Sequence, residues 1–170
     1  MDWLSAREAA KRVTSLDPNV RPTLVKDPGA FRRRIARMAA MADIVKLSED
    51  DLVWLAPETA FATVAGRWLE TGTRLAVLTR GAAGAVALTR NLSLAIPGIA
   101  IPVADTVGAG DTFTAGLLAR LNHRGLLSKG GVAALTEENL TDAIAFAVKA
   151  ASITVSRPGA DPPWQRELDD

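Results

Sequence analysis

The sequence contains no cysteine, which excludes disulfide bonds, thiolate catalysis and cysteine metal sites and permits a reducing compartment. Twenty basic residues against 19 acidic ones give a formal charge of +1, so nothing attracts the chain generally to nucleic acid or to an anionic membrane. No apolar run approaches the roughly 18 residues of a membrane span, and the N-terminus lacks the uninterrupted apolar core of a signal peptide. These absences predict a cytoplasmic protein that recognises its partners at local sites.

Two other classes of protein are excluded by what individual motifs lack. No GxxxxGK occurs, which excludes a Walker-type NTPase. The Gly108-x-Gly110 pair has Phe113 where a dinucleotide-binding loop has its third glycine, and the pair lies late in the chain, which excludes a dinucleotide-dependent oxidoreductase.

The arginines of 32–37 have no interleaved aromatic residues, so a solvated helix face explains them. The single histidine, His123, needs no catalytic role near a helix C-terminus.

What the sequence does contain is a regular alternation of short apolar runs and amphipathic segments. Its 170 residues, 48% of them hydrophobic, are enough for one packed domain. The alternation predicts an α/β fold with a mostly parallel central sheet. We expect strands at 13–16, 43–46, 75–78 and 85–89, helices at 6–12, from 28 to about 42, from 49, at 58–71, from about 109 and from 136, and a flexible connection at 126–135.

The stretch 105–121 organises the other elements. Phe113, Leu117 and Leu121 recur every four residues, which predicts a helix that begins near residue 109 with one buried face. The first turn of a helix has free N–H groups and a partial positive charge. Gly108 and Gly110 have no side chains that would keep a phosphate away from these groups. The stretch therefore predicts an anion site, although a tight turn would also explain the glycines.

Asp111 follows these glycines inside the expected first turn. The field of the helix favours its ionised form, and the carboxylate would reach whatever the turn binds. Asp is also common in first turns for this electrostatic reason alone, so Gly-Ala-Gly-Asp by itself leaves both interpretations open. The longer run from Asp105 to Phe113, DTVGAGDTF, is more specific.

This run resembles the second signature of the ribokinase/PfkB family of carbohydrate kinases. The resemblance implies a three-layer α/β/α ribokinase-like sandwich. It also implies transfer of the γ-phosphoryl group of ATP to the hydroxyl of a fructose- or ribose-type sugar. In that reaction Asp111 would act as the base, and the amides of Gly108, Ala109 and Gly110 would form the anion hole.

The same resemblance implies an ATP site built from several segments. Without the resemblance, each segment has a plainer explanation. The glycines of the TRGAAG turn at 79–84 would only close a hairpin, and the small residues of the last helix would only allow close packing. The segment from Asp17 to Arg21 would be equally well explained as a turn or as a chemical site. With the resemblance, the turn lies along the nucleotide, the D-x-N-x-R segment lies near the phosphates, and the last helix touches adenine. The ATP-binding residues that follow are Thr79, Gly81, Gly84, Asn19, Ala147, Ala151 and Gly159.

Two cation sites are implied in the same way. The family has an Asn-x-x-Glu element whose Glu acts on hydrated Mg²⁺, and Glu49 occupies the Glu position here, with Asp50 as the alternative if the register shifts by one. Lys46 stands at the Asn position, which either marks a subfamily or places an ammonium in the metal and phosphate network. Asp105 and Gly159 are the candidates for a monovalent cation such as K⁺.

The resemblance covers nearly all of residues 1–170 but only the C-terminal half to two-thirds of a family member. Most of the family's sugar-binding residues, its Gly-Gly element and its lid are expected to have no counterpart here, so 1–170 is expected to be a single partial domain. A truncated kinase, a split gene and a decayed remnant all fit. The expected partners are ATP and a small sugar, with a homodimer or a complementing N-terminal fragment. The alternative is a non-catalytic nucleotide-binding fragment.

Overall fold

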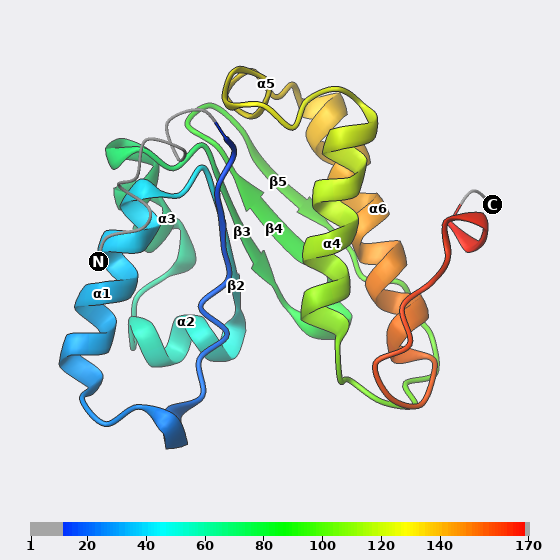
Figure 1. Cartoon of the computed structure of the whole chain (residues 1–170), viewed down its shortest axis with the longest axis horizontal. Helices are drawn as coiled ribbons and strands as arrows, with labels where there is room; N and C mark the ends of the chain where they lie inside the picture. Colours follow the sequence, from blue (N-terminus) through cyan, green and yellow to red (C-terminus); the bar gives the residue numbers. More distant parts are fainter. Residues whose placement is uncertain (1–11, 169–170) are drawn as a thin grey trace.

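The computed structural model describes residues 12–168, so the helix expected at 6–12 lies outside the described residues except for Arg12. Its centre is one sheet with helices on both faces (Figure 1). This arrangement confirms the expected α/β fold of three layers. The strands lie side by side in chain order: β1 (Ser15–Leu16), β2 (Ile44–Ser48), β3 (Leu75–Thr79), β4 (Ala85–Leu88) and β5 (Ser93–Ile96).

Six α-helices and three short 3₁₀ turns complete the described chain. Helices α1 and α3 pack on one face of the sheet and α4 and α6 on the other (Figure 1). None of the helices in residues 12–168 has the length and apolar character needed to cross a membrane. The helices are α1 (Pro28–Met41), α2 (Glu49–Leu55), α3 (Phe61–Thr71), α4 (Ala109–His123), α5 (Lys129–Ala133) and α6 (Glu137–Val155), and the 3₁₀ turns are η2 (Pro22–Leu24), η3 (Gly81–Ala83) and η4 (Gln165–Glu167).

The sheet is mixed. Strands β1, β2 and β3 run parallel, as expected, whereas β4 pairs antiparallel with β3, and β5 pairs antiparallel with β4. The short connection between β3 and β4 explains the change of direction, because a parallel pair needs a crossover of a dozen or more residues. The sheet is therefore parallel only in its first three strands.

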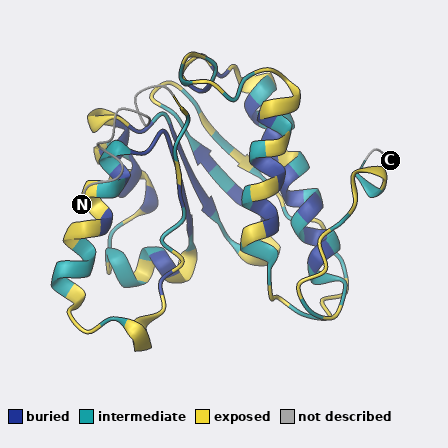
Figure 2. Cartoon of the chain, in the orientation of Figure 1, coloured by how far each residue is buried: buried dark blue, intermediate teal, exposed yellow. Residues whose placement is uncertain are grey.

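Two hydrophobic cores lie on opposite faces of β2 and β3. Ile44 packs toward α4 and α6, whereas Val45 and Leu47 pack toward α1 and α3. Side chains alternate between the two faces of a strand, so one strand supplies both cores. Figure 2 shows the buried residues along these central strands. Lys46 shares the face of Ile44 and therefore points to the layer of α4.

Most helix starts are those that the sequence predicts. The Asp27 carboxylate accepts a hydrogen bond from the N–H of Ala30, and the Ser48 hydroxyl accepts one from Asp51 at 3.1 Å. Each cap satisfies an N–H that the helix itself leaves free. The side chain of Thr136 caps α6 in the same way.

Three expectations about the elements were wrong. Helix α3 begins at Phe61 rather than at residue 58, since Glu58 has a φ of 58° that a right-handed helix cannot contain. The connection expected at 126–135 contains α5, whose N–H at Gly131 is capped by Ser128. Strand β5 was not expected, because its alternating residues are only partly buried.

The amino ends of the parallel strands are joined by a buried carboxylate. Asp43 is 3% exposed and accepts hydrogen bonds from Lys129 Nζ at 2.7 Å, Arg74 Nε at 3.0 Å and the N–H of Thr14 at 2.9 Å. Burial raises the pKa of Asp43, but the hydrogen bonds from these donors together lower it by more than burial raises it. The pKa of Asp43 therefore lies below the ordinary carboxyl value. The cluster ties β1, β2, β3 and α5 together.

Helices α4 and α6 pack closely against each other. A side chain at Gly116 would lie 3.2 Å from Ala147 Cα, so the glycine allows the two backbones to approach. Further along, Arg120 donates to both Asp142 oxygens, at 2.8 and 2.6 Å, and Arg124 donates at 2.9 Å. The hydrogen bonds from Arg120 are the largest cause that lowers the pKa of Asp142 to about 2, against the opposing effect of burial.

We predict that Asp142→Asn lowers the free energy of unfolding by about 1–2 kcal/mol at neutral pH, since the carboxylate is only partly shielded from solvent. The folded-state pKa is below the ordinary 3.8, so this stabilisation is complete above 3.8 and is lost as the pH falls through about 2. Urea unfolding of both proteins over a pH series measures the difference. Glu70→Gln, at an exposed residue of α3, is the control, and a difference that does not shrink at low pH would contradict the assignment.

Candidate functional site

Several of the expected site residues lie at one edge of the sheet. The carboxyl ends of β2 and β3 lie there together with the N-terminal end of α4 (Figure 1). Ligands of open α/β sheets bind outside the carboxyl ends of the parallel strands. The site is therefore expected at this edge, opposite the Asp43 cluster.

A cavity of about 410 Å³ opens beside the start of α4. This volume falls within the range of about 300 to 1,000 Å³ that is typical of small-molecule sites. Its wall is mostly apolar, with polar groups from Thr79, Thr106 and Ser152. The cavity is lined by Thr79, Gly81, Ala82, Gly84, Gly98, Ile99, Ala100, Ile101, Val103, Thr106, Ala109, Gly110, Phe113, Val148, Ala151, Ser152 and Val155.

Two glycines hold one wall of the cavity in place. Gly84 has a φ of 86°, and a Cβ there would lie 2.1 Å from the carbonyl oxygen of Ile96. A Cβ at Gly98 would lie 2.2 Å from the carbonyl oxygen of Ala82. Both contacts are too short for any side chain, so the 3₁₀ turn η3 and the loop after β5 approach backbone to backbone. Gly98 was not among the residues that the sequence predicted, because no motif contains it.

The start of α4 is shaped by Gly108, which has a left-handed φ of 80°. A Cβ at this position would lie 2.9 Å from Ala160 Cβ. Within residues 12–168, no protein acceptor is found for the N–H groups of Gly108 and Gly110. The N–H of Ala109, expected to act with them, instead donates to the Thr106 carbonyl at 3.3 Å. The helix therefore offers the two glycine amides to a ligand.

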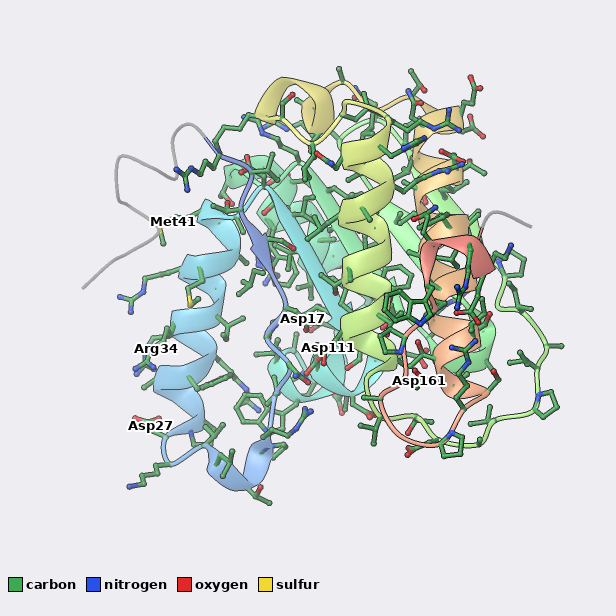
Figure 3. All side chains as sticks on the ribbon, turned by 45° about the vertical axis from the view of Figure 1, so that its right-hand side comes forward. Asp17, Asp27, Arg34, Met41, Asp111 and Asp161 are labelled. Carbon is green, nitrogen blue, oxygen red and sulfur yellow. The ribbon has the colours of Figure 1, made fainter. Side chains whose placement is uncertain are left out.

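Asp111 occupies the first turn of α4 and is exposed. It borders a groove with Ala115 and Pro162 rather than the apolar cavity. Figure 3 labels Asp111 and Asp17 near each other at the lower end of α4. A carboxylate here is accessible to a second ligand that approaches from outside the cavity.

Lys46 joins Asp17 to the start of α4. Its Nζ donates to Asp17 Oδ2 at 3.0 Å, and a Cβ built on Gly110 would lie 2.9 Å from the same Nζ. The sequence drew attention to Lys46 as an unusual residue, but it gave no signal that Asp17, 29 residues earlier, would be its partner. The pair places one positive and one negative charge beside the glycine amides.

Another carboxylate fixes the 17–20 segment. Asp51 is 5% exposed and accepts from the N–H of Val20 at 2.7 Å and from the Ser48 hydroxyl at 2.6 Å. The sequence predicted only a first-turn acid at this position. Its hydrogen bonds hold the loop after β1 against the start of α2 and so position Asp17.

Asp105 and Gly159, predicted as neighbours of a monovalent cation, do meet. Asp105 accepts hydrogen bonds from the N–H of Val107 at 3.0 Å and from the N–H of Gly159 at 3.0 Å. These two bonds, the Val107 bond first, lower the pKa of Asp105 below its ordinary value. The contact joins the loop before α4 to the loop after α6.

The other predicted residues divide into two groups. Thr79, Gly81, Gly84 and Ala151 line the apolar cavity, and the Thr79 hydroxyl donates to the Leu47 carbonyl at 3.2 Å. Two more predicted residues lie apart from the cavity. Ala147 is fully buried against α4. Asn19 is exposed and borders a second groove, where its Oδ1 accepts a hydrogen bond from Arg21 at 2.6 Å.

The predicted metal-binding residues do not form a preassembled protein site. Glu49 and Asp50 are exposed in the first turn of α2, at the edge of the sheet where β2 ends. Within residues 12–168, no group of three or more His, Cys, Asp or Glu residues could hold a metal ion.

Comparisons with known proteins identify a family. The model of the pfkB family of carbohydrate kinases matches residues 2–167. The fructokinase of Rhizobium leguminosarum bv. trifolii is 48% identical over 134 residues, which are 79% of this chain and 41% of that protein.

Among solved structures, fructokinases are again similar to this chain. The crystal structure of a fructokinase from Xylella fastidiosa with bound ATP superposes with a TM-score of 0.83 at 25% identity, over 94% of this chain and 50% of that one. A fructokinase double mutant from Vibrio cholerae O395, in its fructose-, ADP- and potassium-bound form, gives a TM-score of 0.75 at 30% identity, over 91% and 48%. The chain spans about half the length of these relatives, or less.

We predict that Gly108→Ala lowers the free energy of unfolding by about 1–3 kcal/mol. The left-handed conformation costs a side chain roughly 1–2 kcal/mol, and Ala160 must move as well. Gly130→Ala is the matched control, because no atom lies within 4 Å of a Cβ at that helical position, and alanine favours helices. Urea unfolding compares the two variants. Equal stability would show that the start of α4 does not depend on Gly108.

Proposed function

Because the chain belongs to the pfkB family of carbohydrate kinases, we propose that it binds ATP and transfers the γ-phosphoryl group to a hydroxyl of a fructose- or ribose-type sugar. The observation that carries this proposal is the start of α4, where the amides of Gly108 and Gly110 have no protein acceptor within residues 12–168, Gly110 lines an apolar cavity, and the neighbouring Asp111 is exposed. The names of the Rhizobium and Vibrio relatives favour fructose as the first acceptor to test.

The nucleotide would occupy the cavity of about 410 Å³. Its apolar part, between α4 and α6, suits a flat base that contacts Ala151 and Val148, and the turn with Thr79 and Gly81 would follow the ribose and phosphates. Neither Ala147 nor Asn19 borders this cavity, so we assign them no direct contact with the nucleotide. Ala147 would act through the packing of α6 on α4.

In the reaction, the sugar oxygen forms a bond to the γ-phosphorus while the bond from that phosphorus to the bridging oxygen breaks and ADP leaves. Charge spreads over the transferred oxygens, and the amides of Gly108 and Gly110 would stabilise it. The Asp111 carboxylate would receive the proton of the sugar hydroxyl. Its position outside the cavity suits this role, because the acceptor must approach the phosphorus from the side opposite to ADP.

The cations of the reaction would have separate positions. Mg²⁺ would neutralise phosphate charge, and Glu49 would bind its water shell at the end of β2. A monovalent cation such as K⁺ would lie near Asp105 and Gly159, where the two loops are already joined. The carboxylate of Asp105 has a lowered pKa and stays ionised at neutral pH, as a cation site requires.

The second candidate function is binding of the nucleotide without turnover. In that case turnover would need a homodimer or a complementing N-terminal fragment. Calorimetric titration with ATP, combined with Mg²⁺-dependent ADP formation over fructose, ribose, ketodeoxygluconate and adenosine, separates the two. Turnover with one acceptor supports the kinase. ATP binding without turnover supports the binding fragment, and no ATP binding rejects both.

We predict that Asp111→Asn lowers kcat by about 10²- to 10⁴-fold, the usual contribution of a general base. ATP affinity should change little, because Asp111 borders a groove outside the cavity. Coupled-enzyme detection of ADP measures kcat, and calorimetry measures the affinity. Asp161→Asn is the control, since this carboxylate is exposed and pairs with Arg157. If the Asp111 variant retained full kcat, its role as the base would be excluded.

We predict that Glu49→Gln raises the Mg²⁺ concentration needed for half-maximal activity about tenfold, whereas Asp50→Asn changes it less than twofold. The neutral amide binds the water shell of Mg²⁺ more weakly than the carboxylate does. Both residues are exposed in the first turn of α2, so the Asp50 variant controls for the loss of one negative charge from that turn. Mg²⁺ titration of the initial rate is the measurement. If Asp50→Asn raised the required Mg²⁺ concentration more than Glu49→Gln did, Asp50 and not Glu49 would be the residue that binds the water shell of Mg²⁺.

A further inference from the structure

Lys46 has the most unusual environment of a charged group at the proposed site. Its side chain is 5% exposed, although it ends in an amino group that forms an ion pair, and it lies in strand β2 between β1 and β3. It shares the face of Ile44, so it points toward α4 rather than toward α1 and α3. A buried charge is costly unless other groups compensate it.

The compensation that the protein provides is partial. An ammonium has three N–H donors, and within residues 12–168 one of them has a partner, Asp17 Oδ2 at 3.0 Å. Asp17 has a side-chain exposure of 19%, so this pair lies at the border between the sheet and the open site. Two donors of the Lys46 ammonium therefore have no partner within residues 12–168.

The chemistry of that ligand follows from the neighbours of the ammonium. A Cβ on Gly110 would lie 2.9 Å from Lys46 Nζ, so the ammonium lies directly against the first turn of α4. A cation at a helix N-terminus is unfavourable, because both carry positive charge. The free amide of Gly110 and the ammonium thus add their positive potentials at one point. Such a site suits a ligand with more negative charge than one carboxylate supplies.

We propose that Lys46 is a phosphate ligand for the terminal phosphoryl group of ATP, and that Asp17 is the positioning residue that holds its ammonium against Gly110. This inference rests on the proposed function and names a residue of the same site. Gly110 then has two tasks, because its missing side chain admits the phosphate and also leaves room for the ammonium. A purely structural ion pair between β1 and β2 is the competing explanation.

The test is the difference in affinity between ATP and ADP, which differ by the terminal phosphoryl group. Calorimetric titrations at one Mg²⁺ concentration should show that Lys46→Met weakens ATP binding tenfold or more and changes ADP binding less than threefold. Charge-assisted hydrogen bonds to phosphate are strong enough for a loss of this size. Lys26→Met, at an exposed lysine of the loop before α1, is the matched control and should leave both affinities unchanged.

Two further variants separate binding from folding. Lys46→Met combined with Asp17→Asn leaves no unpaired charge in the buried pair, and it should show the same selective loss of ATP affinity in a folded protein. Gly110→Ala keeps both charges but displaces the ammonium, and it should also reduce ATP binding more than ADP binding. An unchanged ratio of the two affinities in the double variant would overturn the proposal and leave a structural pair.

The wild-type protein distinguishes failure of this inference from failure of the proposed function. If the wild type binds both nucleotides and the variants keep its preference for ATP, only the role of Lys46 is rejected. If the wild type binds neither nucleotide, the proposed function is rejected, and the role of Lys46 with it.

Discussion

The conformation of the chain at Gly108 is the constraint on which the rest of the site depends. Its left-handed φ of 80° turns the loop that follows β5 into α4, and its missing side chain lets the loop after α6 approach at Ala160. The bond from Gly159 to Asp105 then closes the two loops on each other. Any residue with a side chain would have to move this loop or the helix. The two glycine amides and the exposed Asp111 depend on this turn for their positions.

Strand β2 connects the folding of the chain to the chemistry of the site. Alternation along the strand sends Val45 and Leu47 into one core and Ile44 into the other. The same alternation directs Lys46 toward α4. It lies two residues after Ile44, nearer the carboxyl end of the strand, where the hydrophobic layer ends. A buried cation is tolerated there because Asp17 and the open edge of the sheet are within reach. The strand is thus apolar where it stabilises the fold and charged where it meets the site.

The sequence predicted the local features well, because they depend on neighbouring residues. The start of α4 followed from two glycines and a four-residue apolar repeat, and the start of α1 followed from Asp27 and Pro28. Features that depend on tertiary packing were not accessible. Strand β5 has only partly buried residues, and Lys46 meets a partner 29 residues away. Similarly, Ala147 and Ala151 are one helical turn apart with the same side chain, yet only Ala151 reaches the cavity.

The parallel direction of β1, β2 and β3 separates two kinds of residue in space. Their carboxyl ends lie beside the start of α4 and the proposed site, whereas their amino ends carry Asp43 with Lys129, Arg74 and Thr14. Substitutions around Asp43 would therefore change how tightly the layers hold together at a distance from the proposed site. At the other end of the strands the two demands coincide, because Gly108 fixes both the start of α4 and its packing against Ala160.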